Sequence, residues 1–79
     1  SRIFAREGFN EGIYQASCRF RGSFSQLVDE AESIENARVL VHSAFESGSD
    51  GDITTVCHLS VTTDSQDRNQ QVLQQILQP

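Results

Sequence analysis

RFRGSFSQLVDEAESIENARVLV, residues 19–41, changes its hydrophobic rhythm twice within one short stretch. It leaves an alternating segment at Gly22, becomes helical in its spacing, and continues as an apolar run after Asn36. Alternation predicts a strand, and apolar residues three and four apart predict a helix. The stretch therefore predicts a strand–helix–strand unit, and this unit decides the fold.

The first strand of this unit is predicted over residues 13–21. Its apolar residues occupy every second position, and the positions between them are polar or charged. This is the pattern of a strand with one buried face. The residues predicted to face the core are Tyr14, Ala16, Cys18 and Phe20.

The helix is predicted over residues 23–35. Ser23 is a suitable N-cap, and Gln26 three residues later completes a capping box. Asn36 is a suitable stop. The stripe predicted to face the core consists of Phe24, Leu27, Val28, Ala31 and Ile34.

Two further strands are predicted over residues 38–46 and 53–63, separated by a loop with Asp50-Gly51 at its centre. That dipeptide is a strong hairpin signal. In residues 38–46, Val39, Val41 and Phe45 are predicted to face the core. In residues 53–63 the core face is predicted to include Cys57, Leu59 and Val61. A short amphipathic helix is predicted over residues 70–78.

The predicted element order is β-α-β-β-α, which gives an α+β domain of the ferredoxin-like α/β sandwich type. A right-handed crossover leaves a gap between its two parallel strands, and the last strand fills it. The prediction is a three-stranded antiparallel sheet of order 1-3-2 with both helices on one face. Residues 13–79 are predicted to be this single domain, and residues 1–12 an N-terminal arm or the end of a preceding helix. A fourth strand would come from residues 1–9, from beyond Pro79, or from a partner.

Composition and charge limit the possible partners. The 79 residues carry 11 acidic and 6 basic side chains, a net charge of −5, and all the basic residues are Arg. Nucleic acid is not expected as a partner, because phosphate binding needs clustered cations. No apolar run is long enough to span a membrane, so we expect no direct membrane insertion of this fragment. The first residue is Ser, so we expect a piece of a longer protein.

The two cysteines, Cys18 and Cys57, are both predicted to face the helices from neighbouring strands. A disulfide needs Cα atoms within about 7 Å, which neighbouring strands allow when the register agrees. The alternative is a pair of buried thiols that act as small hydrophobic side chains. The sequence leaves both open.

The two histidines, His42 and His58, are predicted on the face of the sheet opposite the helices. A three-residue loop over residues 49–51 would place them directly opposite each other, and a longer loop would place His42 opposite Ser60. A zinc site needs three or four ligands, and no third is available nearby. We therefore expect neither a metal nor another cofactor.

The acidic residues of the first helix do not predict catalysis. Paired carboxylates need a cleft that separates their pKa values, and an exposed helical face supplies none. No nucleophilic triad or phosphate loop can be assembled, so we expect no enzyme. The residues in question are Asp29, Glu30, Glu32 and Glu35.

The turn Arg21-Gly22-Ser23 is a candidate ligand site. Backbone N–H groups at a helix start can hold an anion. The simpler alternative is a tight turn followed by an N-cap.

The sheet face without helices is the strongest functional indication. An unpaired edge and a partly apolar face favour a partner strand or a second copy of the chain, so we expect a protein partner, in the first place a homodimer. The predicted interface residues are Leu40, His42, Ala44, Val56 and His58.

Residues 11–63 resemble the PilO-type assembly component of type IV pilus and related secretion machines. The similarity lies in a strand that runs into Gly-Ser-aromatic, a helix, and an Arg that opens the next strand. The following strand corresponds to DITTVCHLSVTT, residues 52–63. The resemblance implies a periplasmic, non-catalytic domain of an inner-membrane protein that dimerises and aligns partners. The matching positions are Gly22, Ser23, Phe24, Leu27, Arg38 and Val39.

The chain is also similar to ACT-like regulatory domains, which share the β-α-β-β-α order and a Gly at the first strand–helix turn. This resemblance implies a cytoplasmic domain that dimerises and senses a small ligand such as an amino acid, with Gly22 lining the site. The turn FRGSF, residues 20–24, departs from the acidic-x-Pro-Gly turn of that family. The two resemblances leave the compartment open.

Overall fold

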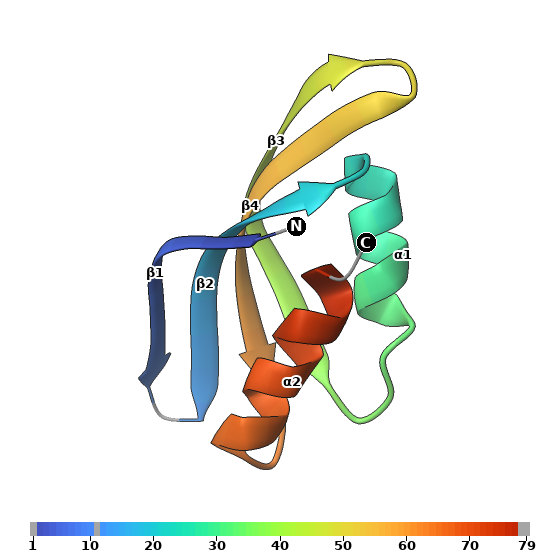
Figure 1. Ribbon diagram of the computed structural model, residues 1–79. Coiled ribbons are helices and arrows are strands. Elements are labelled where there is room, and N and C mark those ends of the chain that lie inside the picture. Colours follow the sequence, from blue (N-terminus) through green and yellow to red (C-terminus); the bar gives the residue numbers. More distant parts are fainter. Residues whose placement is uncertain (1, 11, 78–79) are drawn as a thin grey trace.

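The computed structural model describes residues 2–10 and 12–77, with side chains from residue 12 onward. Four strands form one antiparallel sheet in the order β1-β2-β4-β3, and both helices pack on the same face of it (Figure 1). The elements are β1 (Arg2–Asn10), β2 (Ile13–Arg21), α1 (Phe24–Glu32), β3 (Arg38–Ser49), β4 (Asp52–Thr62) and α2 (Gln66–Leu77).

The predicted three strands and their 1-3-2 order are confirmed as β2, β4 and β3. β1 adds a fourth strand on the free side of β2, so the fourth strand comes from residues 2–10, one of the three sources expected from the sequence. Residues 2–10 are therefore not an arm or a helix end. Their pairing with β2 shifts register between Phe4 and Glu7, which breaks the period of two by which a strand is recognised.

The core lies between the sheet and the two helices. It combines the alternating residues of β2 and β4 with the apolar stripes of α1 and α2, as their spacing predicted. Phe24, at the start of α1, is an exception, because its side chain is 43% exposed. The buried apolar residues are Tyr14, Ala16, Cys18, Phe20, Leu27, Ala31, Ile34, Cys57, Leu59, Val61, Val72, Leu73, Ile76 and Leu77.

The predicted capping box begins α1. The Gln26 N–H donates to Ser23 Oγ at 3.2 Å, and the Ser23 N–H donates to Gln26 Oε1 at 2.7 Å. The helix ends at Glu32, earlier than predicted. Asn36 lies in the following turn with φ of 59°, a left-handed conformation that Asn tolerates.

The second helix begins earlier than predicted, at Gln66. Ser65 precedes it and accepts the Arg68 N–H at its Oγ, 3.1 Å away. Its buried apolar residues are Val72, Leu73, Ile76 and Leu77, consistent with the predicted amphipathic helix. Asn69 is also buried, and its Nδ2 donates to the Gly12 carbonyl at 3.2 Å. Gln78, the predicted last residue of the helix, lies outside the described residues.

The β3–β4 hairpin has a shorter loop than predicted, because β3 continues to Ser49 and β4 begins at Asp52. Ser49 pairs with Asp52, so its turn is the two residues Asp50-Gly51, shorter than either loop considered. A register shift between Val41 and Ser43 leaves His42 as an extra residue, a β-bulge. From this bulge onward, the faces of β3 are exchanged relative to the sequence pattern.

The exchange corrects two predictions. Val39 and Val41 oppose Val61 and Leu59 as predicted, but Phe45 opposes Val56 and lies on the face without helices. Ala44, predicted on that face, opposes Cys57 and lies on the helix side. The end of this hairpin projects beyond both helices (Figure 1). We call residues 43–56 the hairpin arm.

Candidate interaction surface and adjoining pocket

The open face is the side of β2, β4 and β3 that carries no helix. Opposed residues of paired strands share a face, so the pairings define it row by row. From the arm downward the rows are Arg21–Thr54–Ser47, Arg19–Val56–Phe45, Ser17–His58–Ser43, Gln15–Ser60–Leu40 and Ile13–Thr62–Arg38.

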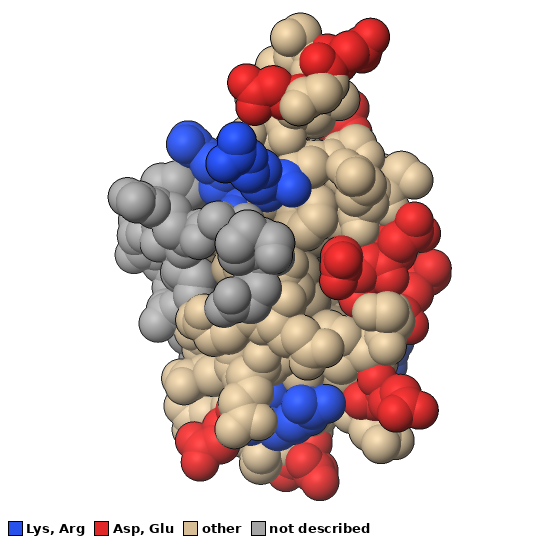
Figure 2. Space-filling model, turned by 45° about the vertical axis from the view of Figure 1, so that its right-hand side comes forward, with Lys and Arg blue, Asp and Glu red and all other residues tan. Residues whose placement is uncertain are grey.

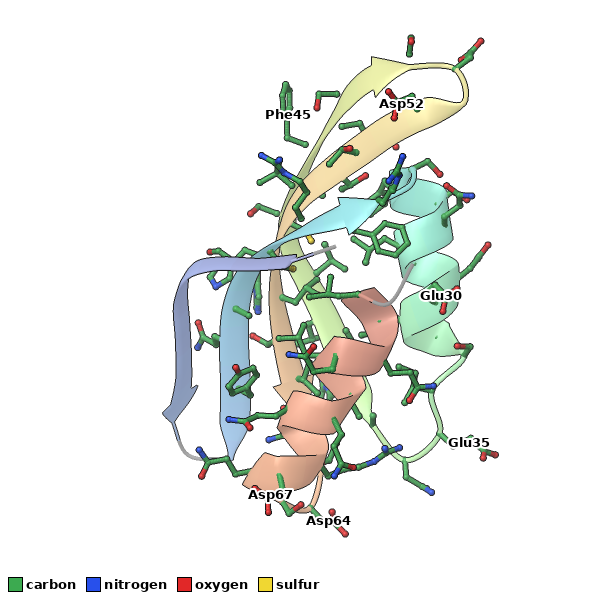
Figure 3. All side chains as sticks on the ribbon, in the orientation of Figure 1. Glu30, Glu35, Phe45, Asp52, Asp64 and Asp67 are labelled. Atoms are coloured by element: carbon green, nitrogen blue, oxygen red, sulfur yellow. The ribbon has the colours of Figure 1, made fainter. Side chains whose placement is uncertain are left out.

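Apolar side chains are exposed on this face. Phe45 is 71% exposed, and Leu40 and Val56 are each 44% exposed. Figure 3 shows Phe45 on the hairpin arm, away from both helices. Phe45 therefore takes the place that the sequence assigned to Ala44, and it adds more apolar surface than Ala44 would.

The two histidines lie together beside this apolar surface. Their ring centroids are 5.4 Å apart at an angle of 48°. His42 Nε2 also shares a hydrogen bond with Ser60 Oγ. The bulge thus places His42 near both partners that the sequence considered. Within the described part of the chain, no group of three or more His, Cys, Asp or Glu side chains could hold a metal ion.

Charged side chains are unevenly distributed over the described residues. The rows of the open face contain Arg19, Arg21 and Arg38 and no acidic residue. The first carboxylate beyond them is Asp52 at the arm's tip. Figure 2, seen from the side of α1, shows acidic side chains along α1, at the arm's tip and at the lower end of the molecule, together with some arginine surface. The exposed carboxylates of α1 and the turn after it are Asp29, Glu30, Glu32 and Glu35.

The candidate ligand turn keeps its backbone donors within the chain. The Ser23 N–H donates to Gln26 Oε1, and the Phe24 N–H donates to Glu46 Oε2 at 2.6 Å. A carboxylate of the chain itself therefore occupies the helix N-terminus, where the helix dipole favours negative charge. Sequence reasoning missed Glu46, because its orientation toward α1 depends on the bulge at His42.

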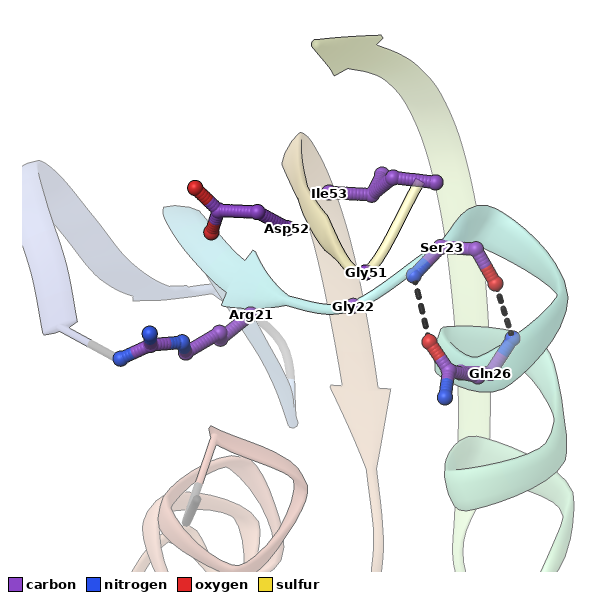
Figure 4. Close-up of a pocket in the computed structure, with 7 residues that line it drawn as sticks. All are labelled: Arg21, Gly22, Ser23, Gln26, Gly51, Asp52 and Ile53. Carbon is purple, nitrogen blue, oxygen red and sulfur yellow. Dashed lines mark hydrogen bonds between the residues drawn. The ribbon is translucent and has the colours of Figure 1, made fainter. Parts of the chain in front are cut away.

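A pocket of about 370 Å³ adjoins this turn. It lies between the end of β2, the start of α1 and the tip of the hairpin arm (Figure 4). Arg21 and Asp52 contribute one cation and one anion to its lining, and both side chains extend away from α1 in Figure 4. The lining residues are Arg21, Gly22, Ser23, Gln26, Gly51, Asp52 and Ile53.

Replacing Gly22 with alanine is expected to destabilise the domain by about 1–3 kcal/mol. Its φ is +150°, and an added Cβ would lie 2.7 Å from both Gln26 Oε1 and the Phe20 ring. Urea unfolding measures the change, and Gly12→Ala is the control, with φ of +82° and no atom within 4 Å of its Cβ. Equal losses in the two variants would contradict a role for the close contacts at Gly22.

The cysteines are brought together in the core. Cys18 pairs with Cys57 across β2 and β4, and their Sγ atoms are 3.1 Å apart. Both are present as free thiols and both are buried. The hydrogen bond with Cys57, and then burial, raises the pKa of the Cys18 thiol well above its usual range.

No family model, no curated protein and no solved structure matches the chain. Among the described residues, neither helix has the length and apolar character needed to cross a membrane. The resemblances to PilO-type and ACT-like domains therefore stay predictions.

Proposed function

We propose that this chain is a non-catalytic interaction domain that associates with further copies of itself through the open face. The observation that carries the proposal is the row Arg19–Val56–Phe45, in which an aromatic side chain that is 71% exposed lies in line with an exposed Val and an Arg. Aromatic residues and Arg are enriched among the residues that dominate binding energy at protein interfaces. Alignment of partner proteins, which the PilO-type resemblance implies, is consistent with such a role.

Charge favours one arrangement of the copies. Two open faces packed against each other would pair surfaces whose rows in β2, β4 and β3 contain no carboxylate, so Arg38 of either copy would find no opposite charge in those rows. The acidic surface of α1, by contrast, complements the open face. The proposed contact therefore joins the open face of one copy to the α1 surface of the next, a heterologous arrangement that differs from the two-fold homodimer predicted from the sequence.

The proposed contact allows assemblies of more than two copies. β3 is the last strand on its side of the sheet, and it is exposed from His42 to its end. A heterologous contact leaves one open face and one α1 surface unoccupied at the two ends of an assembly. The domain is therefore expected to form species larger than two copies as its concentration rises.

Mixing two variants tests this arrangement. Phe45→Asp disables the open face, and the double substitution Glu30→Arg with Glu32→Arg disables the α1 surface. Each variant alone is expected to be monomeric by light scattering, because its association weakens at least about tenfold. An equimolar mixture is expected to form a heterodimer, because each variant supplies the surface that the other lacks.

The other outcomes are distinct. Self-association of the Glu30→Arg, Glu32→Arg variant, with none by Phe45→Asp, would replace the heterologous contact by a two-fold dimer through the open face. A wild-type chain that stays monomeric up to millimolar concentration would overturn the proposal. Gln74→Asp, an exposed change on α2, is the control and is expected to associate as the wild type does. Raising the salt concentration is expected to weaken association, because the contact pairs exposed charges.

The pocket beside Gly22 favours a second candidate, binding of a small zwitterion as the ACT-like resemblance implies. Arg21 would attract a carboxylate and Asp52 an ammonium group, and both line the same 370 Å³ space. Calorimetric titration with a panel of amino acids tests it. Saturable binding of one amino acid that disappears in Asp52→Asn would favour this candidate, and no heat from any of them would remove it.

A further inference from the structure

We infer that Cys18 and Cys57 are a site of disulfide formation, at which the two thiols are oxidised to a bond that joins β2 to β4 beneath the helices. The inference is independent of the proposed self-association, because both side chains lie on the helix side of the sheet. It rests on their register, their separation and their seclusion from other thiols.

The register meets the geometric requirement of a disulfide. Cys18 and Cys57 are directly opposed in the β2–β4 ladder. Opposed residues in antiparallel strands have Cα atoms about 4.5–5.5 Å apart, which falls within the range that disulfides span. The Sγ atoms are already 3.1 Å apart, so the bond length of about 2.05 Å needs a further approach of only about 1 Å.

The bond would act on the central pair of strands. Cys18 precedes Arg19 in β2, and Cys57 follows Val56 in β4. Arg19 and Val56 are directly opposed on the open face. A bond on the helix side would therefore hold together the backbone that presents this pair. It would also close a loop from residue 18 to residue 57 that contains α1 and β3, which restricts the unfolded chain.

Oxidation needs an electron acceptor, and a small disulfide such as oxidised glutathione is sufficient. The thiolate of one cysteine attacks the small disulfide, forms a mixed disulfide and releases one glutathione thiolate. The second cysteine then attacks the protein sulfur of that mixed disulfide, forms the Cys18–Cys57 bond and releases the second glutathione. Two protons leave the protein thiols, and two electrons reduce the glutathione disulfide.

Burial determines when the exchange occurs. Cys18 is 1% exposed and Cys57 is 3% exposed, so a small disulfide does not reach either thiol in the folded domain. The bond is therefore expected to form while the chain folds, or when the helices open from the sheet. Once formed, the same burial protects it from reductants.

Refolding in glutathione redox buffers tests the inference. The unfolded chain is diluted from urea into buffers of graded redox potential, free thiols are then blocked with iodoacetamide, and the products are weighed by mass spectrometry. We expect a folded product that is two hydrogen atoms lighter than the reduced chain and carries no alkyl group. Cys57→Ala is the control, and its single thiol is expected to be alkylated or to carry glutathione.

The same buffers with and without urea give a quantitative criterion. The effective concentration of one thiol toward the other is expected to be at least about tenfold higher in the folded chain than in the unfolded chain. By thermodynamic linkage, the folding equilibrium constant of the oxidised chain must exceed that of the reduced chain by the same factor. An equal or lower effective concentration in the folded chain would overturn the inference, and so would a folded product that keeps two alkylated cysteines in the most oxidising buffer.

Discussion

Replacing Leu59 with alanine is expected to lower the free energy of unfolding by about 2–5 kcal/mol. Leu59 is fully buried in β4, the strand between β2 and β3. Its neighbours across the sheet are Ala16 and Val41, whose short side chains cannot extend into the space that the lost atoms would leave. Because a domain of this size is stabilised by about 5–10 kcal/mol, the variant is expected to unfold at a clearly lower urea concentration than the wild type.

Leu40→Ala is the matched control for this substitution. Leu40 lies on β3, opposite Ser60, and is 44% exposed on the open face. Its loss is expected to cost only about 1 kcal/mol, because nearly half of its surface stays in contact with water in the folded domain. Urea unfolding followed by circular dichroism compares the two. Similar losses in both would mean that the core does not lie on the helix side of β4.

Replacing Gly48 with alanine is expected to open the tip of the hairpin arm. Gly48 has φ of +107°, and an added Cβ would lie 2.1 Å from the carbonyl oxygen of Asp52. That oxygen belongs to the backbone of the partner strand, so the clash cannot be relieved by a rotamer change. The last pairs of the ladder, including Gly48 with Ile53, are expected to separate instead.

Hydrogen exchange measures this opening. The amides of the arm's tip are expected to exchange about a hundredfold faster in Gly48→Ala, while those of β2 and α2 keep their protection. Gly51→Ala is the control, because Gly51 also has a positive φ, +84°, but no atom lies within 4 Å of its added Cβ. It is expected to cost only about 1–2 kcal/mol from backbone strain. Equal exchange in the two variants would mean that the close approach of Asp52 does not shape the tip.

The features that sequence could predict are those set by neighbouring residues. The capping box of Ser23 and Gln26 depends on residues three apart, and the stripe of α2 on residues three and four apart. The alternation in β2 likewise depends on a period of two. The order of β2, β4 and β3 followed from chain connectivity, because a right-handed crossover leaves room for one strand.

The features that sequence could not predict depend on how strands align. The register shift in β1 removes the alternation that identifies a strand, so residues 2–10 gave no such signal. The bulge at His42 has no residue signature of its own, yet it determines the orientation of Phe45 and Glu46. Leu40, Val56 and His58 were therefore assigned to the face without helices on which the structure has them, but Phe45, the most exposed aromatic residue of that face, was assigned to the core.

The bulge at His42 also divides β3 into a part that packs against the core and a part that supplies exposed surface. Before the bulge, Val39 and Val41 pack against the core. After it, Phe45 is exposed on the open face. Deleting His42 would restore the simple alternation and exchange the two faces of β3 in the arm, so that Phe45 would lie on the helix side and Ala44 on the open face. A change of one residue in length at this point would thus change which side chains of the arm are exposed on the open face, while Val39 and Val41 would still face the core. Insertion or deletion of one residue at position 42 would therefore alter the binding surface of the arm without altering the core residues that hold the sheet and helices together.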